Sequence, residues 1–435
     1  MDVLIATGLI FIFVAAIVLG APLFAIIGGG TVLLFKLVAD QGLAVPVIEM
    51  WRLANAPGFV AIPLFIFAGY LFAESNASAR LIRFSDALVG WLPGGLTIVT
   101  VVVCTVFTAV TGASGITIIA CGGILLPALV SSRYDKSFSL GLITASGSSG
   151  VLFLPSLPIL IYGMVAGVDI TMLFIAGILP GLLIVLLLSG YGVIYGARHR
   201  ATVTPFSLKR LGISLWETKW IMPLPVIVVG GIYTGWITVG EAASVTAVYA
   251  LLTECLIYRE ISPARLITIA INSMIMVSAI LIVIAVALGL TNFLVDMRVP
   301  QSLMAFISEH IHSKIVFLLL LNVFLLIVGC LMDIFSAIII VVPLIAPAAL
   351  QFGIDPVHLG IIFLGNLEIG YLTPPVGVNL FIASLRFDTT ILKLYGVVLP
   401  FLLLLVLALL LISYVPEISL WLVELSGKRA PILQI

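Results

Sequence analysis

A Gly-x-Ser-Gly tetrapeptide lies in the middle of a long apolar run, within the stretch AVTGASGIT at residues 109–117. Two kinds of chemistry would suit this pattern in a membrane-embedded chain. Ser114 could be a nucleophile, as in an intramembrane serine protease, and it would then need a base within hydrogen-bond reach. Alternatively, the tetrapeptide could break a helix, so that backbone atoms and the hydroxyl become free to hold an ion.

The positions of the possible bases argue against the protease. His199, His310 and His312 fall in polar linkers, and His358 lies at the edge of an apolar segment. No lysine lies deep in an apolar segment either, so neither kind of base is expected beside Ser114. The sequence therefore predicts that the chain is not an enzyme and that Ser114 is an ion ligand or a hydroxyl at a turn. The protease stays a remote alternative.

Two carboxylic acids, Asp333 and Glu368, occupy apolar segments and have no basic residue nearby in sequence. An acid within the bilayer is costly unless it is protonated, paired or bound to a cation. We therefore expect at least one of the two to belong to an ion or proton site. The other interpretation that stays open is a neutral acid hydrogen-bonded to a helix end.

Two proline-containing stretches interrupt segments that are otherwise long enough to span, SGSSGVLFLPSLP at 146–158 and GNLEIGYLTPPVGVN at 365–379. Proline removes a backbone donor and frees a carbonyl four residues earlier. Freed carbonyls and hydroxyls suit Na⁺, whereas the helix N-terminus beyond each break offers amides that suit a carboxylate. No Lys or Arg lies deep enough to bind a carboxylate, so amides, hydroxyls and bound Na⁺ are expected to recognise an anionic substrate.

The elements that position these residues must be transmembrane helices. The chain has 435 residues, of which 63% are hydrophobic and 9% charged, and this composition is that of a polytopic membrane protein. The net charge is zero and no basic tract occurs, so nucleic acid is not an expected partner. The N-terminal MDVLIATGLIFIFVAAIVLG has an acidic start and no small-residue cleavage site, which predicts a first span and not a signal peptide.

Apolar blocks of about the length that a span requires, roughly 20 residues, follow one another along the chain. They lie near 3–19, 22–39, 58–74, 138–164, 172–197, 221–237, 241–258, 267–294, 358–385 and 391–414. The segment 40–56 is too polar to span and is predicted to lie along the interface as an amphipathic arm. Two longer blocks, 93–130 and 315–354, could each be a re-entrant hairpin or a pair of full spans. We prefer hairpins, because small polar residues at mid-block suit a buried tip.

One constant offset in residue number aligns the two halves of the chain. It superimposes Pro127 on Pro347, Gly150 on Gly370, Pro155 on Pro375 and Pro180 on Pro400, which suggests an internal repeat. Each half crosses the membrane an odd number of times in this layout, so the repeats are expected to have inverted topology. Placing the N-terminus outside puts most of the 19 Lys and Arg in the cytoplasm, in agreement with the positive-inside rule.

The sequence thus predicts an all-α integral membrane protein with two inverted repeats, each of about five spanning helices and one re-entrant hairpin. The first repeat would cover 1–200, with its hairpin at about 93–130 and a broken helix at 138–164. A basic cytoplasmic linker at 201–220 would follow. The second repeat would cover 221–420, with its hairpin at about 315–354 and a broken helix at 358–385, and a tail would occupy 421–435.

These motifs resemble the large membrane subunit of the tripartite ATP-independent periplasmic (TRAP) transporters, in the wider ion-transporter superfamily. The resemblance is carried by GASGIT at 112–117, ITASGSSGVLFLPSLPILIYGMVAG at 143–167, ITVGEAASVTAVYAL at 237–251 and GYLTPPVGVNLFIAS at 370–384. It implies an elevator-type secondary transporter in the bacterial inner membrane, driven by Na⁺. It also implies two partners, a separate small four-helix membrane subunit and a soluble periplasmic binding protein. The binding protein would deliver an organic acid such as a carboxylate, a dicarboxylate or sialic acid.

The resemblance further implies which residues form the transport site. A first Na⁺ site would involve Gly112, Ser114, Gly115, Ser146, Ser149 and Pro155. A second would involve Asp333, Ser336, Asn366, Gly370, Thr373 and Pro375. The substrate is expected to meet Thr117, Ser148, Glu368 and Asn379. A free-standing Na⁺-dicarboxylate symporter of the same superfamily, which would need no partners, stays the main alternative.

Overall fold

A computed structural model describes residues 15, 21, 23–40, 42, 44–51 and 59–427 of the chain. Within these residues every regular element is a helix and no strand occurs. Seven of the described helices are long and apolar enough to cross a membrane. The all-α membrane fold is therefore confirmed, whereas the first predicted span at 3–19 lies outside the described residues, apart from Ala15.

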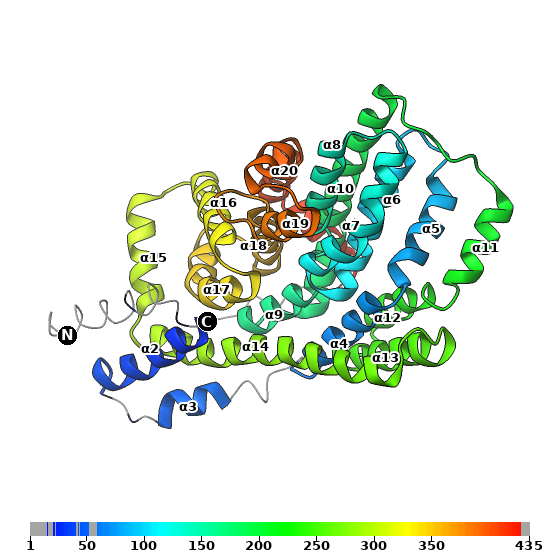
Figure 1. Cartoon of the computed structure of the whole chain (residues 1–435). Coiled ribbons are helices and arrows are strands. Elements are labelled where there is room, and N and C mark those ends of the chain that lie inside the picture. Colours follow the sequence, from blue (N-terminus) through cyan, green and yellow to red (C-terminus); the bar gives the residue numbers. More distant parts are fainter. Residues whose placement is uncertain are drawn as a thin grey trace.

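The first half of the chain contains two helices that are long and apolar enough to span, α7 and α10, together with several shorter helices (Figure 1). In chain order the helices are α2 (Leu23–Leu37), α3 (Ala44–Trp51), α4 (Ala61–Glu74), α5 (Ala77–Val89), α6 (Gly95–Thr111), α7 (Ser114–Ser131), α8 (Lys136–Ser146), α9 (Leu157–Ala166) and α10 (Ile170–Arg198). The predicted hairpin block is divided into α6 and α7 at Gly112 and Ala113. The predicted broken helix is divided into α8 and α9 by the stretch 147–156.

The second half repeats this order after a connecting helix. Its helices are α11 (Leu208–Thr218), α12 (Pro223–Thr234), α13 (Val239–Leu251) with a π-helical turn (Leu252–Ile257), α14 (Pro263–Asp296), α15 (Val299–His310), α16 (Lys314–Leu331), α17 (Ile334–Gln351), α18 (Pro356–Gly370), α19 (Val378–Phe387), α20 (Ile391–Tyr414) and α21 (Glu417–Leu425). The second hairpin block is divided into α16 and α17, and the second broken helix into α18 and α19.

The helix bounds of the two halves agree at the same offset that superimposes Pro127 on Pro347. Helix α7 covers residues 114–131 and α17 covers 334–351. Helices α8 and α18 both begin after an aspartate N-cap, Asp135 or Asp355, whose carboxylate accepts two backbone N–H bonds from the first turn, as N-cap residues do. The two cis X-Pro bonds, at Pro155 and Pro375, also lie at equivalent positions of the repeat.

Contacts between the halves come in exchanged pairs. Helix α9 packs on α17 while α19 packs on α7, and α8 packs on α20 while α18 packs on α10. In the same way α4 packs on α13 and α2 on α14. This is the pattern expected for two halves related by an approximate two-fold axis. The inversion of one half relative to the membrane stays a prediction.

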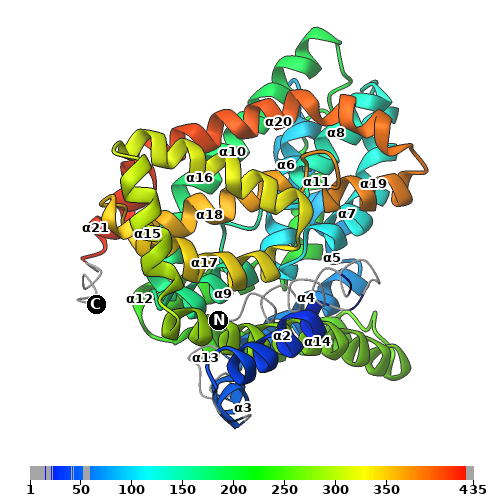
Figure 2. The same cartoon turned by 90° about the vertical axis from the view of Figure 1, so that its left-hand side faces the viewer.

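The helices form two groups. Helices α2, α3, α4, α13 and α14 lie together along one side of the molecule, where they cross or follow the 34-residue α14 (Figures 1 and 2). The hairpins, the broken helices, α10 and α20 form a second group. The transport site predicted from the sequence therefore lies in the second group, next to the first.

Three segments differ in detail from what the sequence predicts. The linker 201–220 is not simply a connection, because its second part forms α11, which packs along α5. The tail predicted at 421–435 begins inside α21, which continues to Leu425. The arm at 40–56 contains α3, whose Val47, Ile48 and Trp51 side chains are exposed, in keeping with an interfacial or partner-facing helix.

Candidate functional site

Both hairpin tips border one pocket with a volume of about 540 Å³. The first tip contributes residues 112–116 and the second contributes residues 333–336. The broken helices add Val151, Pro158, Tyr371 and Val378, and α4 and α14 add Tyr70, Met276, Ala279, Ile280 and Val283. The four residues from α14 lie at the middle of that helix. The hairpin tips therefore lie beside the centre of the longest helix in the described part of the chain.

The first tip offers both an acceptor end and a donor end. Helix α6 ends with Thr111, and its C-cap residue Gly112 has a φ of 68°. This left-handed backbone conformation favours glycine. Helix α7 begins at Ser114 after Ala113, which provides no side-chain cap. The first N–H groups of a helix have no partner within the helix, so the amides at Ser114, Gly115 and Ile116 are available at the pocket wall.

Ser114 joins the first tip to the second broken helix. Its Oγ donates to Oδ1 of Asn379, at the start of α19, over 2.7 Å. The two residues are far apart in sequence, and both are buried. The Nδ2 group of Asn379 has no hydrogen-bond partner among the described residues. Ser114 is thus hydrogen-bonded to an amide and not to a base. A nucleophilic serine requires a hydrogen bond to a base, so this geometry does not suit a nucleophile.

The second tip carries its own helix cap. Asp333 precedes α17, where its carboxylate accepts from the Ser336 N–H over 3.0 Å and from the Ser336 Oγ over 2.5 Å. Tyr371 accepts from the Ile334 N–H over 2.6 Å, which fixes the tip against the second break. Asp333 is therefore hydrogen-bonded to a helix end, as the second interpretation of this acid requires, while its side chain also lines the pocket.

Thr117 lies behind the pocket wall and does not line the pocket. Its hydroxyl and that of Thr108 are 2.6 Å apart, and Thr108 Oγ1 donates to the Gly147 carbonyl over 2.5 Å. These bonds connect α6, α7 and the first break. Thr117 is fully buried. It therefore supports the tip from behind and does not reach the pocket surface, although it was expected to contact the substrate.

The first break concentrates hydroxyls that have no partner. Ser146, Ser148, Ser149 and Ser156 are fully buried, and none of their Oγ atoms has a hydrogen-bond partner in the described part of the chain. The backbone between them forms short turns, in which Ser149 N–H donates to the Ser146 carbonyl and Val151 N–H to the Ser148 carbonyl. Buried hydroxyls without a partner are unfavourable. A cation bound among these oxygens would satisfy them, so the donor set fits Na⁺.

The second break contains a buried acid and a buried amide. Glu368 is fully buried and neither of its carboxylate oxygens has a partner in the region that the structure describes. Asn366 is also fully buried, and its Oδ1 likewise has no partner there. Neither side chain is a member of the pocket lining, whereas Asp333 and Ser336 are.

The other predicted ligands of the second half already have contacts of their own. Thr373 Oγ1 donates to the Ile369 carbonyl over 2.9 Å, and the Pro375 carbonyl accepts from the Tyr395 hydroxyl. Gly370 lies against the backbone of Gly329, so closely that a Cβ atom would stand 2.6 Å from it. The structure thus gives Gly370 a packing role that the sequence did not indicate.

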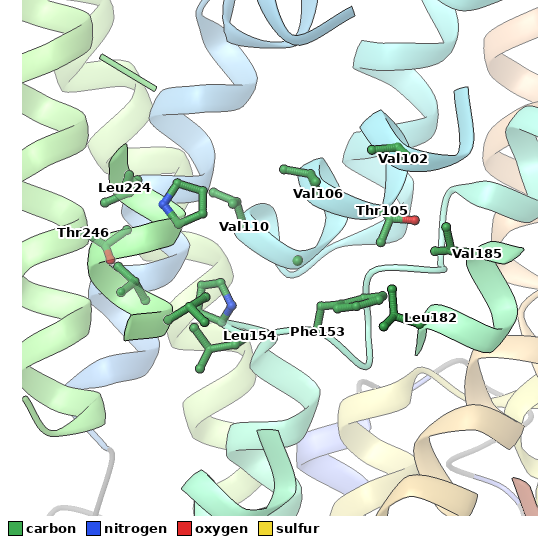
Figure 3. Close-up of a pocket in the computed structure, with 15 residues that line it drawn as sticks. Val102, Thr105, Val106, Val110, Phe153, Leu154, Leu182, Val185, Leu224 and Thr246 are labelled. Carbon is green, nitrogen blue, oxygen red and sulfur yellow. The ribbon is translucent and has the colours of Figure 1, made fainter. Parts of the chain in front are cut away.

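A second cavity, of about 270 Å³, lies on the other side of the first break (Figure 3). Its lining is mostly apolar, with Thr105 and Thr246 as polar residues, and comes from α6, α10, α12, α13 and residues 153–155. Pro155, which was expected at the first Na⁺ site, lines this cavity and not the pocket between the tips. Proline has no side-chain oxygen and could contribute only its carbonyl to such a site.

Sequence reasoning missed the part of the pocket that α4 and α14 supply. Tyr70 and Met276 are in contact across it, with the Tyr70 hydroxyl 3.7 Å from the Met276 sulfur. From Met274 to Leu290, Ser278 is the one polar residue of α14, so the sequence there contains no signal that distinguishes the pocket wall from lipid-facing residues. Tyr371 lies within a motif that was noted, but its bond to the second tip could not be predicted without the fold.

Comparisons with known proteins agree with this architecture. The family model described as "Tripartite ATP-independent periplasmic transporter, DctM component" matches residues 9–418. Over 413 residues the chain is 36% identical to the "Isethionate TRAP transporter permease protein DctMQ" of Oleidesulfovibrio alaskensis, a match that covers 94% of this chain and 65% of that protein. It is 34% identical over 394 residues to the "C4-dicarboxylate TRAP transporter large permease protein DctM" of Pseudomonas aeruginosa, covering 90% of this chain and 92% of that one.

Two solved transporter structures share the fold at low sequence identity. The YdaH transporter of Alcanivorax borkumensis matches with a TM-score of 0.62 and 17% identity, over 93% of this chain and 97% of that one. MtrF of Neisseria gonorrhoeae matches with a TM-score of 0.58 and 12% identity, over 88% and 85% of the two chains. At these identities the likeness concerns the fold alone.

Proposed function

Because the chain belongs to the DctM component of the tripartite ATP-independent periplasmic transporters, we propose that it takes up a small organic acid together with Na⁺. Membership confirms the family resemblance and makes the chain a multi-pass permease of the inner membrane. Its relatives are named transporter permeases, so the chain is not an enzyme and the protease interpretation of Ser114 is wrong.

The observation that carries the proposal is the unequal pair of hairpin tips at one pocket. The N-terminus of α7 has no side-chain cap, whereas that of α17 is capped by Asp333. A helix N-terminus with free amides favours an anion. We assign the substrate carboxylate to the amides of residues 114–116, and a cation to the oxygens around Asp333.

Charge balance in the pocket supports the coupling to Na⁺. The lining residues include no Lys, Arg or His in the part of the chain that the structure describes. An acidic substrate next to Asp333 would therefore face a negative charge without a fixed positive one, which is unfavourable in a low-dielectric site. Bound Na⁺ would supply the missing charge, so substrate and Na⁺ are expected to bind together.

Two Na⁺ sites are proposed, one in each half. The first uses oxygens of the tip at Gly112, Ser114 and Gly115 and of the partnerless hydroxyls at Ser146 and Ser149, with Ser148 beside them. The second uses Asp333 and Ser336 at the tip with Asn366, Gly370, Thr373 and Pro375 at the break. Hydroxyl, carbonyl and carboxylate oxygens are the ligands that hard cations prefer. Among the described residues no cluster of His, Cys, Asp and Glu suits a transition metal.

An elevator movement is proposed for the group of helices that carries the hairpins. The pocket separates the tips from α4 and α14, and the apolar cavity separates α6 and the first break from α12 and α13 (Figure 3). The pocket thus lies at the boundary between the two helix groups, and the cavity lies between the second group and α12 with α13. A boundary that is not tightly packed favours a rigid movement of one group along the other.

The partners and the substrate class are proposed from the family. Relatives are named for isethionate, C4-dicarboxylates and ectoine, all small polar molecules. We propose that a soluble periplasmic binding protein delivers such a substrate and that a small membrane subunit completes the transporter. The chain spans 65% of the length of the isethionate relative and nearly the full length of the C4-dicarboxylate relatives.

Uptake in proteoliposomes tests the proposal. The permease would be reconstituted alone, with the small subunit, and with small subunit and binding protein, under an inward Na⁺ gradient. Labelled C4-dicarboxylates, isethionate, ectoine and sialic acid would be the substrates. We expect Na⁺-dependent uptake of at least one acid, and only with all three proteins present.

Each other result has a definite meaning. Uptake by the permease alone would establish the free-standing symporter instead. Uptake that needs a proton gradient and not Na⁺ would reject the Na⁺ sites but keep the transport function. No flux of any acid in any combination would reject the proposed function.

A further inference from the structure

Three polar side chains meet inside the second half, outside the pocket lining. They are Asn322 of α16, Asn366 of α18 and Ser413 of α20, each 3% exposed or less. The Asn366 Nδ2 group donates to Asn322 Oδ1 over 2.7 Å, and Ser413 Oγ donates to the same oxygen over 3.2 Å. Asn322 is therefore the acceptor on which the other two converge.

This arrangement fixes the orientation of the Asn366 amide. Its Nδ2 group also donates to the Ile362 carbonyl over 2.8 Å, so both amide protons are in use. A flipped amide would place its oxygen against two acceptors, and the hydrogen-bond network therefore determines which atom is which. The atom left over is Asn366 Oδ1, which is buried and has no partner among the described residues.

A buried carbonyl oxygen that accepts no hydrogen bond is unfavourable unless a bound ligand interacts with it. An amide oxygen is a hard ligand that suits Na⁺ better than an anion. Asn366 lies one turn before the C-terminus of α18 at Gly370, where the negative end of the helix dipole also favours a cation. Asn366 is also one of the residues that were expected to bind the second Na⁺, and this oxygen is the atom it has available for that role.

We infer that Asn322 is a positioning residue for this site: by accepting from Asn366 Nδ2, it turns the Asn366 carbonyl oxygen toward bound Na⁺. Asn322 does not itself bind the cation. The inference rests on the proposed coupling to Na⁺ and adds to it a residue outside the tips and breaks. At the equivalent positions of the first half the chain has Val102 and Ser146, so the first half has no corresponding pair.

The test compares the Na⁺ dependence of uptake in the reconstituted transporter for three forms of the permease. Asn322→Leu has a similar volume but cannot accept a hydrogen bond, so the Asn366 amide would keep only its bond to the Ile362 carbonyl and its orientation would be less firmly fixed. Loss of a partner that orients a metal ligand typically costs about 10–100-fold in affinity. We expect a rise of about tenfold or more in the half-saturating Na⁺ concentration, with the rate at saturating Na⁺ much less affected. Asn322→Asp keeps an acceptor oxygen, and as a neutral acid, the form that burial favours, it should stay close to the unsubstituted protein.

A binding measurement makes the test independent of transport. Na⁺ that binds the folded state raises its unfolding temperature, so the rise would be recorded in detergent for the same variants. Ser273→Ala is the control, since it also removes a buried polar group of a membrane helix, the hydroxyl that donates to the Ala270 carbonyl. It should leave the Na⁺ response unchanged, whereas Asn322→Leu should weaken it.

An unchanged Na⁺ response in folded Asn322→Leu would overturn the inference. Lower stability of Asn322→Leu measured in the absence of Na⁺, together with an unchanged half-saturating Na⁺ concentration for uptake, would also overturn the inference. It would show that Asn322 has a merely structural role. Should the leucine variant fail to fold, Asn322→Ala gives the same comparison, since alanine suits a helix interior. Absence of a Na⁺ effect in the unsubstituted protein would instead reject the proposed coupling, and with it this inference.

Discussion

Asp333 combines two roles that a single substitution can separate. Its carboxylate caps α17, and its charge lies at the pocket. Asn and Asp are similarly good N-caps, so Asp333→Asn should keep the tip folded while it removes the charge. We expect uptake at low Na⁺ to fall at least about tenfold, as for loss of one charged ligand worth about 1.4 kcal/mol or more. The measurement is the Na⁺ dependence of uptake.

Asp333→Ala supplies the comparison for capping. It removes the charge and the cap together, and the lost cap should lower the free energy of unfolding by about 1 kcal/mol. If the asparagine variant kept the full Na⁺ affinity and only the alanine variant lost activity, Asp333 would be a helix cap and not a ligand. The interpretation as a helix-end acid, which the sequence left open, would then be sufficient.

At this scale the sequence identified the residues but not their neighbours. Gly112, Ser114, Asp333 and Ser336 line the pocket as expected from their place in the hairpin blocks. The bond between Ser114 and Asn379 joins the two halves of the chain, and no local pattern predicts a contact at that separation. Asn322 was not a candidate at all, because one asparagine in an apolar segment looks the same whether or not it has a partner.

Between elements, two equivalent glycines set how closely each broken helix approaches its hairpin. A Cβ atom at Gly370 would stand 2.6 Å from the Gly329 backbone, and one at Gly150 would stand 2.5 Å from the Ala109 backbone nitrogen. Positions 109 and 329 are themselves equivalent in the repeat, so the same close contact occurs in both halves. Since backbone atoms cannot yield as side chains do, we expect Gly370→Val to abolish both uptake and a cooperative unfolding transition.

Helix α18 supplies a matched control for this prediction. A Cβ atom at Gly365 would have its nearest neighbour, Leu409, at 3.6 Å, which is ordinary van der Waals contact. Gly365→Ala should therefore fold normally, and it gains helix propensity worth up to about 1 kcal/mol. Unfolding curves in detergent would compare the two variants. Equal tolerance of both would show that the close approach at Gly370 is not required.

A buried ion pair joins the α4–α5 corner to the end of the π-helical turn. The Arg80 guanidinium lies 3.6 Å from the Glu254 carboxylate, contacts Glu260, and covers the ring of Tyr258 at 3.6 Å. Burial raises the pKa of the Tyr258 hydroxyl, although the charge of Arg80 lowers it. Glu254 is fully buried.

Removal of Arg80 should therefore destabilise the permease. Arg80→Met leaves Glu254 buried without its partner, and breaking such a pair typically costs about 3–5 kcal/mol. The exposed pair of Arg83 with Glu217 is the control, because Arg83→Met should cost at most about 1 kcal/mol. Thermal unfolding in detergent measures both. A double substitution, Arg80→Met with Glu254→Leu, should recover part of the loss, and no recovery would contradict the pairing.

Amphipathic helices mark the limit of prediction from apolar blocks. The structure interrupts its helices at 112–113, 147–156, 332–333 and 371–377, within the stretches where the sequence contains helix-breaking glycine, proline or polar residues. The sequence did not predict α5 and α15, which are equivalent elements that precede the two hairpins. Both helices are too polar to be recognised as spans from their sequence. They form because one face of each packs on a neighbouring helix.

For the whole molecule, the exchanged contacts between the halves indicate an approximate two-fold relation, but no contact reports which side of the membrane a loop faces. The number of membrane crossings in each half decides which side the loops face. If each hairpin returns to the side from which it entered, each half crosses an odd number of times and the halves are inverted. Equivalent positions at the hairpin ends must then face opposite compartments.

Ser131 and Gln351 are such a pair. They are the last residues of α7 and α17, occupy equivalent positions of the repeat, and are both exposed. Cys104, Cys121 and Cys330 are buried, so replacing the half-buried Cys255 by serine gives a background with little reactive thiol. In vesicles of known orientation, a membrane-impermeant maleimide should label Ser131→Cys from the cytoplasmic side and Gln351→Cys from the periplasmic side. Labelling of both from one side would exclude inverted repeats, and the reverse assignment would keep the inversion while placing the N-terminus in the cytoplasm.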